Sequence, residues 1–122
     1  MRSSILAVVA TLAALGTASS AAACIYPRPP ENVPDGRTAT YDQMVEGQTA
    51  VKAFDANVTA YTACLQLERD SLLANPELDE ARRSEIAAMY VKKNNAAVDE
   101  VQSVADRFNE QLRAFKERSK KD

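Results

Sequence analysis

The chain has 122 residues, of which 46% are hydrophobic, with 15 basic and 17 acidic side chains and no histidine. Because the charges nearly balance, the composition gives no support to nucleic-acid binding. A sequence without histidine cannot form Ser-His or Cys-His nucleophilic pairs or imidazole-bound zinc sites, and it lacks the commonest general base. We therefore expect a protein that is not an enzyme and carries no cofactor or metal.

The first 23 residues have the pattern of a secretory signal peptide. A single cation at Arg2 precedes an apolar run from Ile5 to Leu15, and small residues follow as far as Ala23. The run is shorter than the ~20 residues that a membrane-spanning helix needs. We expect cleavage after Ala23, no transmembrane segment in the mature protein, and a periplasmic or secreted location.

The two cysteines, Cys24 and Cys64, would both enter an oxidising compartment on export. A disulfide between them is the first interpretation. The alternative is an envelope lipoprotein acylated at Cys24, since three alanines precede that residue, and only then would the protein associate with a membrane. The cysteines lie too far apart in the sequence for the Cys-x-x-Cys motif of a thiol oxidoreductase.

A proline-rich segment, residues 24–39, follows the expected cleavage site. Proline lacks an amide donor and favours extended backbone, so neither a helix nor a central strand is expected here. Asp35-Gly36 after a proline predicts a turn. We expect an extended arm that runs back along the first helix, tied by the disulfide; a disordered leader is the alternative. The prolines are Pro27, Pro29, Pro30 and Pro34.

A first amphipathic helix is expected over residues 40–74, where apolar residues recur every three or four positions. Thr40, with Gln43 three residues later, predicts a capping box at its start. Asn75 precedes a proline and is thereby disfavoured in the helical region, so the helix should end there. The apolar stripe comprises Met44, Gly47, Val51, Phe54, Val58, Tyr61, Leu65 and Leu72.

A second amphipathic helix is expected over about residues 76–118. Pro76 suits the first turn of a helix, and the acidic residues after it favour the positive end of the helix dipole. Asparagines near Lys93 interrupt the apolar face, so a local kink there is an alternative to a continuous helix. The apolar face comprises Ile86, Tyr90, Ala97, Val101, Val104, Phe108, Leu112 and Phe115.

Together the two helices predict an all-α fold, an antiparallel two-helix hairpin over residues 40–122. If the chain reverses at the Asn-Pro step, Gly47 lies beside Val104, and Tyr61 stacks near Tyr90. Large side chains then meet small ones at several levels, as a close-packed core requires.

In this register Leu112 and Phe115 extend past the start of the first helix. They would pack under the arm or form an interaction surface for another protein. A two-helix core buries little apolar area, which favours a staple or a partner. Self-association into a four-helix bundle is one possibility. The exposed positions available for it are Val45, Ala53, Ala56, Ala60, Val91 and Val98.

The arm and first helix carry a distinctive set of residues: Cys24, Tyr26-Pro27, Pro30, Pro34-Asp35-Gly36, Thr38-Ala39-Thr40, Met44, the AVKAF segment at 50–54, Tyr61 and Cys64-Leu65. This set resembles a family of small secreted proteobacterial proteins. The resemblance covers roughly residues 24–65 and implies a periplasmic address and a mainly helical fold. It brings no catalytic residues, and the second helix shares none of its motif.

Charged clusters have ordinary explanations. The acidic residues near the start of the second helix and the basic residues near its end both suit the helix dipole. We therefore expect a non-enzymatic secreted or periplasmic helical protein with a binding, chaperone-like or envelope-structural role. The alternative remains a lipid-anchored envelope lipoprotein.

Overall fold

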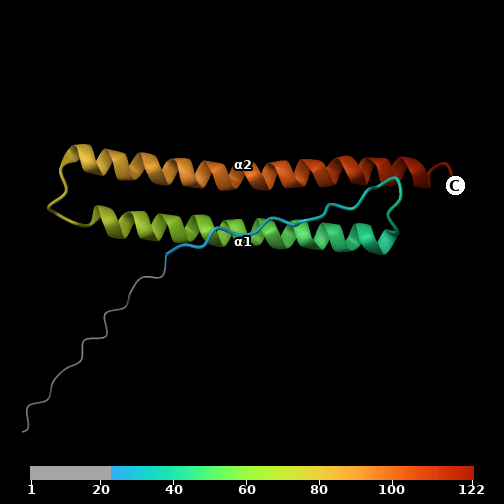
Figure 1. Cartoon of the computed structure of the whole chain (residues 1–122), viewed down its shortest axis with the longest axis horizontal. Coiled ribbons are helices and arrows are strands. Elements are labelled where there is room, and N and C mark those ends of the chain that lie inside the picture. Colours follow the sequence, from blue (N-terminus) through green and yellow to red (C-terminus); the bar gives the residue numbers. More distant parts are fainter. Residues whose placement is uncertain (1–22) are drawn as a thin grey trace, which may run out of the picture.

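The computed structural model describes residues 23–122, so the expected signal peptide lies outside the described part except for Ala23. The described residues form two α-helices and no strand: α1 (Tyr41–Leu73) and α2 (Glu80–Ser119). The helices lie side by side and antiparallel, and residues 24–39 run back along them as an extended arm (Figure 1). The predicted all-α hairpin with an extended arm is confirmed.

The start of α1 is the predicted capping box. Thr40 has extended backbone angles, and its side-chain oxygen accepts the N–H of Gln43 at 3.2 Å. In return the Gln43 side-chain carbonyl accepts the N–H of Thr40 at 2.8 Å. Two backbone donors that the helix leaves without partners are therefore satisfied by side chains.

The second helix begins at Glu80, so the expected start at Pro76 is wrong. Asp79 is the N-cap, and its carboxylate accepts the N–H of the third helical residue at 2.7 Å. The Asn75 side-chain oxygen accepts the N–H of Glu77 at 3.0 Å and holds a turn before the helix. The side chains of Asn75 and Asp79 thus accept backbone N–H groups and form a turn before the helix. Pro76 lies in this turn and not in the helix.

One arginine of α2 fastens this connection. The Arg83 guanidinium donates to the carbonyl oxygens of Leu73 at 2.7 Å, Asn75 at 2.8 Å and Leu78 at 3.3 Å. The carbonyls at the end of a helix lack partners within it. Arg83 supplies charged donors to them and so ties the start of α2 to the end of α1.

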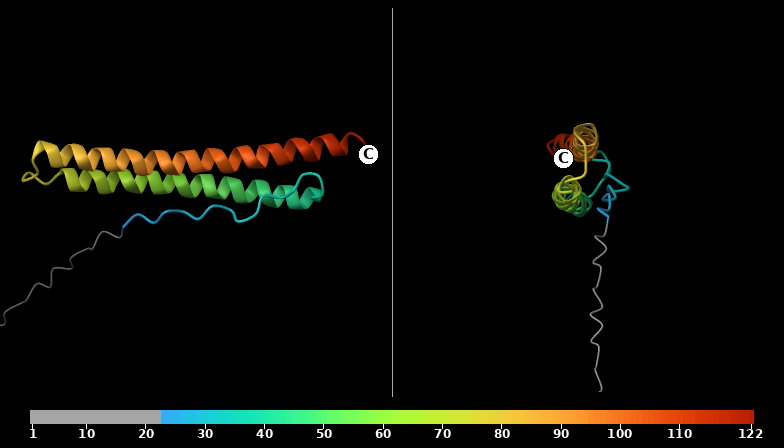
Figure 2. Two further views of the ribbon diagram at one scale, coloured as in Figure 1. Left: turned by 45° about the horizontal axis from the view of Figure 1, so that its top comes forward. Right: turned by 90° about the vertical axis from the view of Figure 1, so that its left-hand side faces the viewer.

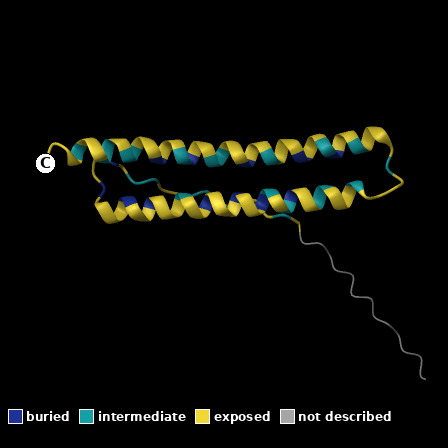
Figure 3. Ribbon diagram, turned by 180° about the vertical axis from the view of Figure 1, so that it is seen from behind, coloured by how far each residue is buried: buried dark blue, intermediate teal, exposed yellow. Residues whose placement is uncertain are grey.

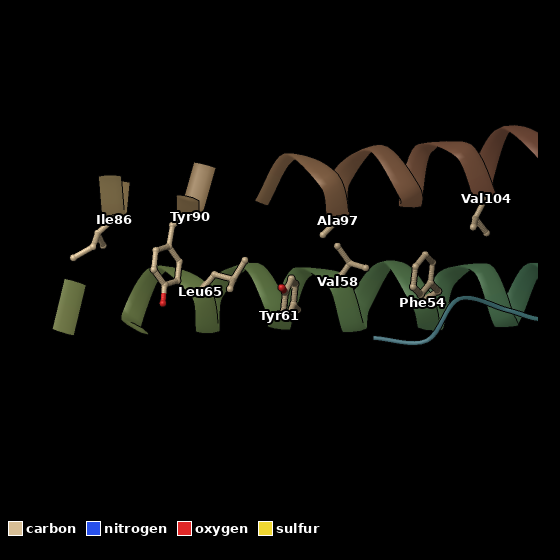
Figure 4. Close-up of a cluster of buried hydrophobic side chains, with 8 residues drawn as sticks. All are labelled: Phe54, Val58, Tyr61, Leu65, Ile86, Tyr90, Ala97 and Val104. Atoms are coloured by element: carbon tan, nitrogen blue, oxygen red, sulfur yellow. The ribbon is translucent and has the colours of Figure 1, made fainter. Parts of the chain in front are cut away.

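The core is a single layer of side chains between the two helices (Figure 4). Ala97 points at Val58, and this small residue lets the helices approach closely. Ala97 and Val104 are fully buried, at 0% exposure. The main cluster comprises Phe54, Val58, Tyr61, Leu65, Ile86, Tyr90, Ala97 and Val104, and a smaller one near the arm turn comprises Ala39, Met44 and Phe108.

The register differs from the expected one by about one helical turn. A Cβ atom at Gly47 would lie 3.1 Å from the Phe108 ring, so Gly47 faces Phe108 and not Val104. The cause is the later start of α2, which lengthens the connection and slides the second helix along the first. The same apolar faces meet, but each residue meets a partner one turn away.

The second helix is continuous from Glu80 to Ser119, so the asparagines near its middle cause no break. The ammonium group of Lys93 lies 5.0 Å from the centroid of the Tyr90 ring. This cation–π contact lies in the segment where the sequence left open a kink instead of a continuous helix.

Candidate functional site

The arm is bonded covalently to α1. Cys24 and Cys64 form a disulfide, with their Cα atoms 5.8 Å apart, and both residues are half-buried. The predicted pairing is confirmed. A lipid anchor on Cys24 would need a thioether bond to the same sulfur atom, and in this structure that atom is bonded to Cys64. The disulfide therefore argues against the lipoprotein alternative.

Two residues beyond the disulfide, Tyr26 joins the arm to both helices. Its ring meets the Tyr61 ring edge to face, with centroids 5.1 Å apart, and its hydroxyl donates a hydrogen bond to the Glu100 carboxylate. Desolvation, followed by this hydrogen bond and the charge of Glu100, raises the pKa of Tyr26 to about 12. The expected stacking of Tyr61 on Tyr90 is wrong, because Leu65 lies between the two rings (Figure 4).

The end of the arm that leads into α1 packs closely against both helices at two glycines, Gly47 of α1 and Gly36 of the arm. A Cβ atom at Gly47 would lie 2.7 Å from the ring carbons of Pro34, so only a glycine leaves room for that proline. Gly36 lies against the α2 backbone, where a Cβ atom would overlap the carbonyl oxygen of Gln111. The Gly36 N–H also donates to the Gln111 side chain at 2.9 Å. Neither glycine has a positive φ angle. Both positions need a glycine because a neighbouring group lies where a Cβ atom would be.

A second arginine of α2 holds the turn that leads from the arm into α1. Arg118 donates to the carbonyl oxygens of Arg37 at 2.8 Å and Ala39 at 2.6 Å. Arg118 is one of the basic residues at the end of α2, where the sequence pattern indicates only a favourable interaction with the helix dipole. No local signal distinguishes Arg118 from the other cations there, because its acceptors lie on a segment distant in the sequence.

Leu112 and Phe115, the predicted interaction surface, are half-buried. Both pack against the smaller core cluster, together with Val33 of the arm. The one-turn change in register moves them level with the start of α1, so they do not project past it. Both also line a shallow hollow between the start of α1 and the end of α2. The interaction surface for another protein stays a prediction.

The arm covers only one side of the helix pair. An end-on view places it to one side of both helices, and a view from behind shows the other face (Figures 2 and 3). Along that face a row of shallow hollows lies between α1 and α2, and no arm residue lines them. We call this row the uncovered groove.

The uncovered groove combines exposed apolar side chains with uncharged polar ones. Val91 at 55% and Tyr41 at 71% are its most exposed apolar residues. Only Asp55 and Arg69 carry charge, and Arg69 is paired with Asp70 at 2.9 Å. The other apolar residues exposed there are Val45 and Val98, and the polar ones are Gln48, Thr59, Thr62, Gln66, Asn94, Asn95 and Gln102.

The residues of the distinctive sequence set gather where the arm meets α1. Cys24 meets Cys64, Tyr26 meets Tyr61, and Thr40 begins the helix. Arm docking therefore accounts for the spacing of these residues. The set describes how the fold is held together and assembles no group of reactive side chains.

Comparisons with protein-family models, curated proteins and solved structures found no match. Among residues 23–122, no three His, Cys, Asp or Glu side chains come together as a metal site would need. Over the same residues, neither helix has the length and apolar character to cross a membrane.

Proposed function

We propose that this protein is a non-enzymatic binding protein of the periplasm or the secreted fraction, and that it holds exposed apolar segments of other proteins in a chaperone-like manner. The disulfide is compatible with an oxidising compartment outside the cytoplasm. The signal-peptide pattern and the resemblance to secreted proteobacterial proteins support the same address. Sequencing the amino terminus of the mature protein tests it, and the expected first residue is Cys24.

The observation that carries this proposal is the uncovered groove. Its exposed valines line successive hollows between the two helices, Val45 on α1 and Val91 and Val98 on α2, with few charges around them. An amphipathic helix binds such a groove through its apolar face, with anchors every three or four residues. Uncharged amide and hydroxyl side chains along the rim can hydrogen-bond a segment of any sequence, which suits a binder of many clients.

An aggregation assay with a chemically unfolded client protein tests the role. We expect the protein at a stoichiometric ratio to slow the rise in light scattering, and the double variant Val91→Asn/Val98→Asn to lose most of this effect. Leu67→Asn is the matched control, because Leu67 is 73% exposed and lies outside the hollows. No suppression by the unaltered protein at stoichiometric excess would remove the chaperone-like role.

A structural role through self-association is the second candidate, because a four-helix bundle would bury the same valines. Sedimentation velocity separates the two. A dimer that dissociates when Val91 and Val98 become asparagine favours the structural role, in which a second copy covers the groove. A monomer at the concentrations of the aggregation assay leaves the groove open for clients.

A further inference from the structure

The two halves of the arm are held in different ways. Residues 24–33 make no backbone–backbone hydrogen bond within the described structure. Their side chains add one hydrogen bond, from Tyr26 to Glu100. The disulfide, the contact of Tyr26 with Tyr61 and the packing of prolines therefore hold this half against the helices.

Residues 34–39, by contrast, are held on several sides. The Asp35 carbonyl oxygen accepts the backbone N–H groups of Thr38 at 3.0 Å and Ala39 at 2.7 Å, which closes the turn. Helix α2 adds further hydrogen bonds: the Gln111 side chain accepts the N–H of Gly36, and Arg118 donates to two carbonyl oxygens of this half. None of these contacts depends on the cysteines.

We infer that the arm is a strap with a redox-controlled latch: reduction of the Cys24–Cys64 disulfide releases residues 24–33, while residues 34–39 and the helical hairpin keep their places. This inference does not depend on the proposed function. Without the covalent bond, three kinds of contact must offset the backbone entropy of the whole half: one aromatic pair, one hydrogen bond at a partly exposed tyrosine, and the packing of the half-buried prolines and Val33. These contacts are too few for that, so the free half leaves the helices.

The reductant is a dithiol, such as the active site of a thiol–disulfide oxidoreductase. One donor thiolate attacks a sulfur atom of the half-buried disulfide and forms a mixed disulfide, and the second donor thiol then displaces this chain's cysteine. The products are two thiols on this chain and one disulfide on the donor. Two electrons pass from donor to protein, and the two protons of the donor thiols are transferred overall.

Release uncovers a second surface, on the side opposite the uncovered groove. The face of Tyr61 that Tyr26 now covers becomes exposed beside the free thiol of Cys64 and the carboxylate of Glu100. Oxidation closes this surface again, because the tethered cysteine needs only to fold back along α1. The redox state of the surroundings thus determines whether this face of Tyr61 is covered or exposed.

Backbone ¹⁵N relaxation of the oxidised protein, before and after treatment with dithiothreitol, tests this inference. We expect order parameters at residues such as Tyr26, Asn32 and Val33 to fall from about 0.85 to below about 0.6. Arg37, Thr38 and both helices should keep their values, and the helical circular dichroism should not change. The double variant Cys24→Ser/Cys64→Ser should reproduce the reduced state without a reductant.

A second measurement follows the ultraviolet absorbance of tyrosinate against pH. In the oxidised protein we expect two tyrosines to titrate above the ordinary range, because burial also raises the pKa of Tyr90, and Tyr26→Phe should remove one of the two transitions. Reduction should return only the Tyr26 transition to the range of ordinary tyrosines. If the arm stays ordered after reduction, the disulfide is no latch. If the helices melt together with the arm, the disulfide is a staple for the whole fold. Either result overturns the inference.

Discussion

The ring of Pro34 lies on Gly47, within 2.7 Å of the position that a Cβ atom would occupy. A glycine inside a helix costs about 1 kcal/mol relative to alanine. A glycine stands in the second turn of α1 because the Pro34 ring occupies the space that a side chain would fill. The same glycine also faces the Phe108 ring of α2, so one missing side chain lets the arm and both helices meet.

Adding a side chain at this point should therefore push the arm away from α1. We expect Gly47→Val to lower the free energy of unfolding by about 2 kcal/mol, as overpacking does. Urea unfolding measures the change. Ala56→Val is the control, since Ala56 is exposed on the same helix and reports the cost of a β-branched residue alone. Equal losses in the two variants would contradict the contact with Pro34.

Gly36→Ala should be more harmful than an alanine at position 47. The neighbour of Gly36 is the backbone of α2 at Gln111, which cannot rotate aside as a side chain can. We expect a loss of about 3 kcal/mol, at the upper end of overpacking. Parallel urea unfolding of Gly36→Ala and Gly47→Ala gives the order, and the reverse order would contradict the close approach of the turn to α2.

Removing the charge of Arg118 should loosen the turn before α1. Arg118→Gln loses two charged hydrogen bonds to backbone carbonyls, and we expect a loss of about 2 kcal/mol. Arg113→Gln, an exposed change of the same type on α2, should cost less than about 0.5 kcal/mol. Hydrogen exchange at Thr38 and Ala39 should speed up only in the Arg118 variant.

Stability should depend on pH through Tyr26. Its pKa is raised to about 12 in the folded protein from an ordinary value of 10.0, so the folded state favours the neutral hydroxyl. Its contribution is fully present below pH 10 and is lost as the pH rises toward 12, because the unfolded chain gives up the proton first. We expect Tyr26→Phe to reduce this loss in urea unfolding between pH 9 and about 11. Tyr41→Phe, at an exposed position, should leave it unchanged.

Cys64→Ser should destabilise the protein by less than the full chain-entropy value. For a cysteine pair separated by 40 residues, that model gives about 4 kcal/mol. In the variant, residues 24–33 are free in the folded state as well as in the unfolded state. The folded variant therefore keeps conformational entropy that the disulfide-bonded protein loses, and the destabilisation is smaller. Thermal unfolding followed by circular dichroism measures the difference, and a loss above about 4 kcal/mol would contradict a locally released arm.

The sequence by itself determined the two helices, the extended arm and the start of α1, whereas the start of α2 lies later than expected. The capping box at Thr40, the period of the apolar stripes and the prolines of the arm depend on neighbours a few residues away, which is why they were predictable. The disulfide was predictable for a different reason, because the chain has two cysteines and an export signal pattern.

Only the tertiary structure showed which residues meet across the helix pair. An apolar stripe repeats at every turn, so sliding one helix past the other by a turn keeps the same faces buried and leaves the pattern unchanged. The choice came from Asn75 and Asp79, whose side chains lengthened the connection, and from the fit of Phe108 against Gly47. Tyr26 and Arg118 found their partners only once that register placed Glu100 and the arm turn beside them.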